Sequence, residues 1–388
     1  MTKTGIILTG GGARAAYQVG VLRAVADMYP DWHYPFDVIL GTSAGAINAM
    51  ALAGSRGLFR HNIDHLDTIW SGLTTDRIFR SGSFSLARNL SAMARKFISR
   101  PVASGQVSLL DNTPLRDLLE REINLDNIRA TIREGHIDAV GLNVCGYNTG
   151  QNICFFEGAE GLEGWSVGQR AGIRTRLDLD HIMASSAIPT LFPPVHINRE
   201  YFGDGATRQM AHISPALRLG ARKVMVVGVS ANRMSPVKRP EKPGMPTMTQ
   251  VLGHVFNGIF LDTLDYDIDR SRIINQLLEL IPPERLDQAG LNLNPVDILE
   301  ISPSEPIDEI AAKYLDGLPL ILRRLAGASD IDGDASASLA SFLLFDPRFC
   351  RDLINLGYRD GQSNARQIER FFSGVTTSGA ASADPESA

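Results

Sequence analysis

Two short glycine-rich segments constrain the fold of this chain more than any other feature of its sequence. Residues 10–14 read GGGAR and residues 41–45 read GTSAG; each follows a mostly apolar run, at 6–8 and 36–40, and precedes a stretch with helical periodicity. A strand, a turn and a helix followed by a second strand form a βαβ unit, whose two strands lie parallel in one sheet. The sequence therefore predicts an α/β fold with a mainly parallel central sheet and helices on both faces.

The second glycine segment places a serine at a sharp turn between a strand and a helix. Residues 41–45 match the pattern Gly-x-Ser-x-Gly, which in this context exposes the serine hydroxyl on a nucleophile elbow. Gly41 and Gly45 suit that role because the backbone of such an elbow packs too tightly for side chains. Ser43 is therefore the candidate nucleophile, and the alternative is a Gly/Ser turn without catalytic function.

The first glycine segment offers backbone N–H groups to a negative charge. A dinucleotide site is not expected, because Ala15 stands where the third glycine belongs and no acidic residue ends the second strand. The segment also lacks the Gly-Lys-Ser/Thr of a P-loop. We expect an oxyanion hole, in which the amides of Gly11 and Gly12 meet the oxygen of a tetrahedral intermediate while Arg14 steadies the loop or a lipid phosphate.

A third segment carries an acidic residue that can act as a partner of the serine. Residues 201–206 read YFGDGA, so Asp204 stands between two glycines after a short apolar strand. By itself this pattern is typical of a tight Asp-Gly turn. Because it follows the two glycine segments in the sequence, Asp204 can also be interpreted as the acidic partner of Ser43.

In this order, the three segments resemble the patatin-like phospholipase family, and the likeness extends over residues 5–230. Residues 184–189 (ASSAIP) and 192–195 (FPPV) add to it. The resemblance implies a three-layer α/β fold and a Ser–Asp dyad without histidine, in which Ser43 is the nucleophile and Asp204 its direct partner. It implies no cofactor and no metal.

The resemblance also assigns supporting roles to the glycines around the dyad. It implies that the oxyanion loop is formed by Gly10, Gly11, Gly12 and Arg14. It implies that the elbow and the Asp turn depend on Gly41, Gly45, Gly205 and Ala206. The sequence departs from the family pattern at Ala15, where the family usually has a glycine.

A carboxylate is a weak base toward a hydroxyl, because the ordinary pKa of aspartate is about 3.9. Burial between Gly203 and Gly205, beneath a bound acyl chain, is expected to raise the pKa of Asp204 and so strengthen it as a base. The alternative is a Ser-His-Asp triad, in which an imidazole removes the proton. His212 follows Asp204 closely in the sequence and is the candidate for that role.

The net charge and the absence of targeting patterns limit which partners and which cellular location we expect for the protein. A net charge of −5 over 388 residues argues against a nucleic-acid binder. The N-terminus runs straight into the first strand without a signal-peptide pattern, and no uncharged apolar run reaches the ~20 residues of a spanning helix. We therefore expect a cytoplasmic protein, and homo-oligomer formation stays open.

One segment is strongly basic and carries aromatic residues. Residues 77–110 contain six Lys or Arg and no Asp or Glu, with Phe79 and Phe84 ahead of apolar residues at helical spacing. Such a helix can lie at an anionic membrane surface, such as the inner face of the membrane, through residues 77–100. The alternative is a helix that packs on the core with its cations in water.

The remaining sequence suggests how the chain is organised. We expect a catalytic α/β core over 1–231, a proline-rich loop over 232–247, a helical region over 248–373 and a disordered tail over 374–388. Within the helical region, residues 248–282, 307–327 and 337–372 are predicted helices, the last with a break near Pro347.

These observations predict a lipid acyl hydrolase that cleaves carboxylic esters of phospholipids or lysophospholipids through an acyl-enzyme on Ser43. The phospholipid class follows from the family resemblance. One alternative is a broad carboxylesterase or thioesterase that uses the same site. Another, of a different class, is a non-catalytic phosphate- or nucleotide-binding module that uses the Gly10–Gly12 loop.

Overall fold

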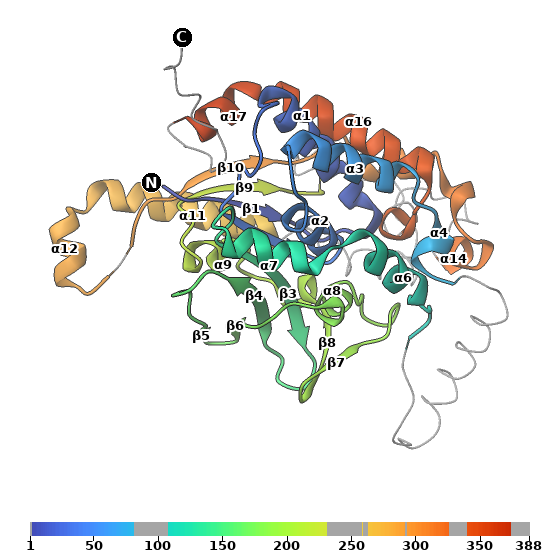
Figure 1. Cartoon of the computed structure of the whole chain (residues 1–388), viewed down its shortest axis with the longest axis horizontal. Coiled ribbons are helices and arrows are strands. Elements are labelled where there is room, and N and C mark those ends of the chain that lie inside the picture. The colour runs from blue at the N-terminus through green and yellow to red at the C-terminus, as the bar shows by residue number, and fades with distance from the viewer. Residues whose placement is uncertain are drawn as a thin grey trace, which may run out of the picture.

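The computed structural model describes residues 2–80, 108–230, 258, 263–291, 293–325 and 340–373, and its centre is a ten-stranded sheet (Figure 1). The main path of the sheet has the order β10-β9-β1-β2-β3-β4-β6-β5, and β8 pairs with β3 and β7. The strands are β1 (Thr4–Leu8), β2 (Val38–Thr42), β3 (Ala139–Gly146), β4 (Asn152–Gly158), β5 (Trp165–Val167), β6 (Arg170–Arg174), β7 (Val195–Ile197), β8 (Glu200–Asp204), β9 (Lys223–Val227) and β10 (Asp297–Ile301).

Helices connect these strands and cover the sheet. The N-terminal half of the chain contributes η1 (Gly12–Ala15), α1 (Ala16–Met28), α2 (Ala44–Ala53), α3 (Phe59–Ser71), α4 (Thr75–Ile78), α6 (Thr113–Glu122), α7 (Leu125–Arg133) and α8 (Leu179–Ser185). The remainder contributes η2 (Gly205–Arg208), α9 (Ser214–Arg218), α11 (Thr263–Leu280), α12 (Pro283–Gln288), α13 (Ile307–Ala312), η3 (Leu315–Gly317), α14 (Leu320–Leu325), α16 (Pro347–Ser363) and α17 (Ala365–Phe372).

The strands at the centre of the sheet are parallel and buried on both faces. Every residue of β1, β2 and β3 is buried, which explains why their sequences are continuous apolar runs. Leu8 of β1 lies opposite Gly41 of β2 in the parallel register. Because the carboxyl ends of parallel strands meet at one edge of a sheet, the two glycine turns that follow β1 and β2 lie side by side.

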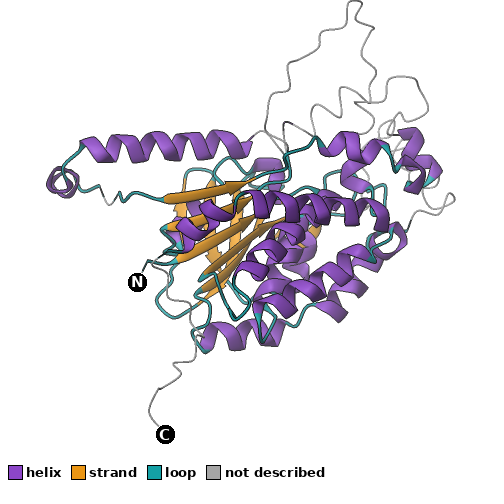
Figure 2. Cartoon of the chain, turned by 90° about the horizontal axis from the view of Figure 1, so that it is seen from above, coloured by secondary structure: helices purple, strands orange, loops and turns teal. Residues whose placement is uncertain are grey.

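Alternate residues of the central strands enter two different cores. Ile6 and Leu8 belong to the larger core, together with buried residues of α1, α2, α3 and α16. Ile7 belongs to the smaller core, together with residues of α9 and α11. Seen from above, helices flank the strands on both sides (Figure 2). The predicted α/β fold, with a mainly parallel sheet between helical layers, is confirmed.

The C-terminal helix α16 packs directly on α1 through two glycines. A Cβ added at Gly20 would lie 1.9 Å from the carbonyl oxygen of Ile354, and one at Gly357 would lie 2.1 Å from that of Tyr17. The two helix backbones can therefore approach only because these side chains are absent. The Tyr17 hydroxyl also donates to Asp360 at 2.9 Å. Helix α16 is thus part of the layer that covers the first βαβ unit.

Several predicted elements agree with the structure, and the C-terminal region adds one strand that was not predicted. The hairpin of β3 and β4 and the strand β9 are confirmed. The stretch predicted to be helical over 307–327 is helical but broken into α13, η3 and α14, and Pro319 separates the last two. The helical C-terminal region also contains β10, which pairs parallel with β9 and so extends the central sheet.

Three predicted segments lie wholly or mostly outside the described residues. These are the proline-rich loop at 232–247, the tail at 374–388 and residues 81–107 of the basic segment. Among the described residues, no helix is both long enough and apolar enough to cross a membrane.

The described start of the basic segment belongs to the core. Phe79 is fully buried, and its ring lies 5.8 Å from that of Phe192 and 6.4 Å from that of Phe345. Arg80 pairs with Asp111 at 3.4 Å. The expectation that Phe79 belongs to a membrane-facing aromatic set is therefore wrong, because its ring packs between buried aromatic side chains.

Candidate active site

Ser43 sits on a strained turn between β2 and α2. Its backbone has φ 56° and ψ −128°, a conformation that residues with a side chain rarely adopt. The turn is also too tight for neighbouring side chains: a Cβ at Gly41 would lie 2.4 Å from the carbonyl oxygen of Gly45, and one at Gly45 would lie 2.2 Å from that of Leu8. The glycines of the Gly-x-Ser-x-Gly pattern are thus required by packing, and the strain is typical of a functional turn.

Two serines of the ASSAIP segment hold the backbone of this elbow. The N–H of Ser43 donates to Oγ of Ser185 at 3.0 Å, and Ser185 in turn donates to the carbonyl of Asn143 at 2.7 Å. The hydroxyl of Ser186 donates to the carbonyl of Ser43 at 3.3 Å. The sequence showed this segment only as a family likeness, without a role for either serine. Their positioning role follows from contacts between α8 and the elbow.

Asp204 ends β8 and is completely buried. Its N–H donates to the carbonyl of Ala187, and its Oδ1 accepts from the N–H of Ala206, both at 2.9 Å. A Cβ at Gly205 would lie 2.2 Å from the carbonyl oxygen of Asn143. The Asp-Gly-Ala turn therefore fixes the carboxyl group against β3, and the glycine after it is required by close packing.

The structure places Ser43 and Asp204 as neighbours. Burial raises the pKa of Asp204 to about 7, while the nearby Ser43 side chain and the hydrogen bond from the Ala206 N–H act in the lowering direction. Oδ2 of Asp204 is buried and has no hydrogen-bond partner among the described residues. A carboxyl group with a pKa near neutrality, next to a serine hydroxyl, has the basicity that proton removal requires.

His212 lies in a different environment. Its Nε2 lies 3.0 Å from Oγ1 of Thr263 on the side of α11, and it makes no hydrogen bond with Ser43 or Asp204 in the described part of the chain. Burial lowers the pKa of His212 to about 4. The geometry therefore gives no support to a Ser-His-Asp triad that uses this residue.

The glycine loop passes directly beside the elbow. A Cβ at Gly10 would lie 3.0 Å from Cβ of Ser43, and Gly12 lines the same pocket as Ser43. Gly12 has φ +56°, in the left-handed region that favours glycine. Within the described residues, no hydrogen bond uses the N–H groups of Gly11 and Gly12. These donors have the freedom that an oxyanion hole needs.

Arg14 connects this loop to the C-terminal region. Its guanidinium is buried, pairs with Asp308 at 2.5 Å and donates to Oγ of Ser341 at 2.8 Å. It also lies 4.3 Å from the ring centre of Phe342. Of the two roles expected for Arg14, the structure favours steadying the loop, because the guanidinium is buried among protein groups. The C-terminal region is thereby part of the site, which the sequence did not reveal.

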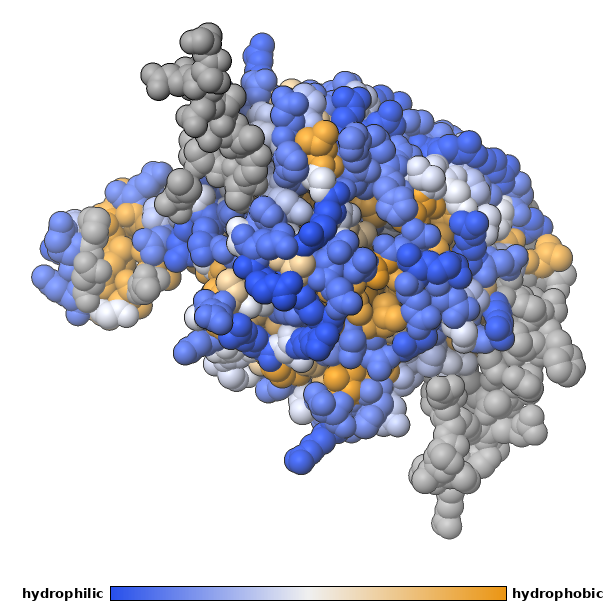
Figure 3. Space-filling model, viewed as in Figure 1, coloured by the Kyte–Doolittle hydropathy of each residue, from blue (hydrophilic) through white to orange (hydrophobic). Residues whose placement is uncertain are grey.

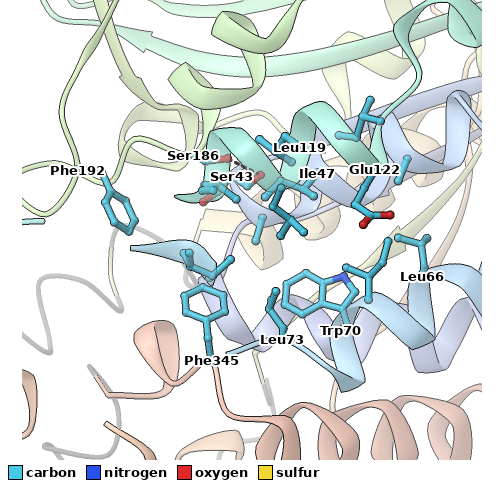
Figure 4. A pocket seen from close by; sticks show the side chains of 18 of the residues that line it. Ser43, Ile47, Leu66, Trp70, Leu73, Leu119, Glu122, Ser186, Phe192 and Phe345 are labelled. Atoms are coloured by element: carbon cyan, nitrogen blue, oxygen red, sulfur yellow. Dashed lines mark hydrogen bonds between the residues drawn. The ribbon is translucent and has the colours of Figure 1, made fainter. Parts of the chain in front are cut away.

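Ser43 forms part of the wall of an apolar pocket between α2, α3 and α6 (Figure 4). The pocket holds about 720 Å³ of empty space, including part that is open to solvent. In the space-filling view, hydrophobic side chains gather in the hollow between α3 and the α6–α7 pair (Figure 3). The lining consists of Gly12, Ser43, Ala44, Ile47, Ala51, Leu66, Ile69, Trp70, Leu73, Ile78, Leu115, Leu118, Leu119, Glu122, Ile123, Ser186, Ile188, Phe192 and Phe345.

This lining suits an apolar ligand. Among the described residues of the lining, the hydroxyl and carboxylate groups come from Ser43, Ser186 and Glu122 alone. Among the described residues, no group of three His, Cys, Asp or Glu side chains is placed to hold a metal ion. The arrangement can therefore present a hydrocarbon chain to a serine hydroxyl that has a buried carboxyl group beside it.

Comparison with known proteins agrees with the order of the motifs. The family model described as patatin-like phospholipase matches residues 6–217, more than half of the chain. No curated protein matches the chain.

Fourteen chains of solved structures match, two of which are described here. VipD from Legionella pneumophila is 12% identical with a TM-score of 0.37, and the match covers 95% of this chain and 67% of VipD. Human GIVD cytosolic phospholipase A2 is 12% identical with a TM-score of 0.42, and the match covers 95% of this chain and 60% of that protein. The chain thus spans about two thirds or less of these proteins.

Proposed function

This chain belongs to the patatin-like phospholipase family, and on that premise we propose that it is a serine acyl hydrolase of phospholipids or lysophospholipids. Membership of the family supports lipid hydrolase activity. The observation that carries the finer proposal is the position of Ser43, on a strained elbow beside the buried Asp204 and in the wall of an apolar pocket. Lipid esters combine an apolar chain with a carbonyl group that a serine can attack.

In the first half of the proposed reaction, Asp204 takes the proton of the Ser43 hydroxyl as its oxygen attacks the ester carbonyl. The carbonyl oxygen becomes an oxyanion, which the N–H groups of Gly11 and Gly12 stabilise; losing one such donor typically costs about 3–4 kcal/mol of barrier. The intermediate then breaks its bond to the alcohol oxygen, which takes the proton from Asp204. An acyl group remains on Ser43.

In the second half, a water molecule replaces the alcohol. Asp204 removes a proton from the water, whose oxygen attacks the acyl carbonyl and forms a second oxyanion in the same hole. The bond to Ser43 then breaks, and the serine oxygen recovers its proton from Asp204. The near-neutral pKa of Asp204 suits both directions of this transfer, since the same group must accept and return a proton.

A broad carboxylesterase or thioesterase would use the same residues, and only a substrate panel distinguishes it. The phosphate- or nucleotide-binding module has less support, because Arg14 of the glycine loop is buried and paired with Asp308. The lining of the pocket is also apolar, which does not suit a phosphate group.

The proposal is tested by labelling the protein with a fluorophosphonate probe, locating the label by mass spectrometry and measuring the products from a panel of phospholipids, lysophospholipids, simple esters and thioesters. We expect the label on Ser43, and free fatty acid from the lipid esters. Ser43→Ala should lose both, while Ser363→Ala, a change of an exposed serine on α16, should keep both. Hydrolysis that persists in Ser43→Ala, or a label elsewhere, would contradict the proposal.

A further inference from the structure

One wall of the apolar pocket is a single face of α2. Ile47 and Ala51 of α2 line the pocket at four-residue spacing, and Ser43, at the N-cap of the same helix, lines it four residues before Ile47. Ser43 and Ala51 are about 12 Å apart along the axis, since an α-helix rises by roughly 1.5 Å per residue. The pocket is therefore a slot that extends about 12 Å from the candidate nucleophile.

The other two walls keep this slot apolar along its length. Trp70 of α3 is held beside the middle of α2, because its Nε1 donates to Oδ1 of Asn48 at 2.7 Å. Leu115 and Leu119 of α6 line the opposite side. A hydrocarbon chain that starts at Ser43 thus meets only apolar side chains until it passes the indole ring.

The end of the slot far from Ser43 carries an ionisable side chain, unlike the apolar walls. Figure 4 shows Glu122 and Leu66 at the end away from Phe192 and Phe345, with Ser43 between the two ends. Glu122 is the one ionisable residue in the lining that the described residues form. Its Oε2 lies 3.2 Å from Nε2 of His65, whose side chain is 58% exposed. The carboxylate of Glu122 thus stands where the apolar lining ends and solvent begins.

We propose that the Glu122–His65 pair marks the end of the acyl subsite and that the slot selects acyl chains of medium length, about ten carbons, over long ones. An extended hydrocarbon advances by roughly 1.25 Å per C–C bond, given the usual bond length and angle, so about ten carbons fill 12 Å. This inference rests on the proposed function, because it takes the slot to hold the acyl chain of the substrate.

The limit follows from the cost of covering a carboxylate with hydrocarbon. Each methylene that enters the slot before Glu122 leaves water for an apolar wall and gains affinity. A longer chain must either lie against the carboxylate, which removes water from a charged group, or push it away from His65. Glu122 is accordingly a specificity-determining residue, which makes no contact with the reacting atoms.

The test measures binding, so it needs no catalysis. The full chain is titrated by calorimetry with hexanoate, octanoate, decanoate, dodecanoate and tetradecanoate, each below its micelle concentration. Affinity should rise about fourfold per added methylene, the equivalent of ~0.8 kcal/mol per buried CH₂, and level off after decanoate. In Glu122→Leu the rise should continue to tetradecanoate, whereas in Ala51→Phe, which fills the far end, it should stop earlier.

The matched control is Glu120→Leu, a change of an exposed carboxylate on the same helix that does not line the slot. This variant should keep the wild-type profile. The inference is overturned if no fatty acid binds, if affinity rises unbroken to tetradecanoate in the wild type, or if Glu122→Leu and Glu120→Leu behave alike. If instead the proposed function fails, the fatty-acid binding profile stays as expected but the protein does not hydrolyse p-nitrophenyl butyrate.

Discussion

Asp204 and His212 are both buried, and they lie on the same stretch of chain, yet their surroundings differ. Asp204 faces Ser43, and burial raises its pKa to about 7. His212 contacts Thr263 in the layer with α11, and burial lowers its pKa to about 4. In each case burial favours the neutral form. A strongly shifted pKa is therefore not by itself a sign of catalysis; the neighbouring Ser43 and the apolar slot distinguish Asp204.

The largest expected effect separates the two residues by activity. Asp204→Asn keeps the shape of the side chain but removes the base, so hydrolysis should fall by about 10³-fold or more. His212→Gln should keep activity within about threefold, because His212 makes no hydrogen bond with Ser43 or Asp204 in the described chain. Ester hydrolysis by both variants, with circular dichroism to verify folding, checks this. Equal losses in the two variants would contradict the distinction.

The next effect is on stability at alkaline pH. The folded pKa of Asp204 lies above its ordinary value of 3.8, so its contribution to stability is full below that value and is lost as pH rises through about 7. At about pH 8 the ionised carboxylate is buried, and Asp204→Asn should be more stable than wild type by up to about 4 kcal/mol. Denaturant unfolding at about pH 8 and pH 4 measures this gain, which should vanish at the lower pH.

His212 should show the opposite dependence. Its folded pKa lies below its ordinary value of 6.5, so stability is full above that value and is lost as pH falls toward 4, by up to about 3 kcal/mol. His212→Gln should lack this loss, and the two unfolding curves should therefore converge in acid. If His212→Gln loses as much stability as the wild type between about pH 6.5 and pH 4, another titrating group is responsible for the loss.

Arg14 is a third buried ionisable group, and it differs from Asp204 and His212 because it forms an ion pair, with Asp308. Burial lowers the pKa of Arg14, while Asp308 acts in the raising direction. Asp308→Asn should destabilise the protein by about 1 kcal/mol, a modest value because the Asp308 side chain is 33% exposed. Asp316→Asn, which removes an exposed partner of Arg348, is the control and should change stability by less than about 0.5 kcal/mol.

Local patterns pointed to residues that the structure brings close together. Ser43, Asp204 and their flanking glycines were found because each stands in a short motif whose spacing reflects steric needs. The clashes that a Cβ would meet at Gly41, Gly45 and Gly205 are the physical reason for those motifs. The first βαβ unit was predictable for the same reason, since its turns and apolar runs are contiguous in sequence.

Features that depend on distant contacts were not predictable. Nothing near Asp308 or Ser341 indicates that they hold Arg14 of the glycine loop, and nothing near Glu122 indicates the end of a slot that begins at Ser43. The strand β10 was missed because DILEI is a short apolar run that propensity alone does not separate from a helix. Such contacts are decided by how the layers pack.

The central claim, that Asp204 acts as the base for Ser43, is tested most directly by the rate at which a fluorophosphonate probe labels Ser43 as a function of pH. In this reaction the serine oxygen attacks the phosphorus of the probe and fluoride leaves, so the rate includes no hydrolysis of an acyl-enzyme. We expect a rate that rises with pH around a midpoint of about 7 in the wild type and is strongly reduced at every pH in Asp204→Asn. A rate that does not change from about pH 5 to about pH 9, with Asp204→Asn labelled as fast as wild type, would contradict it.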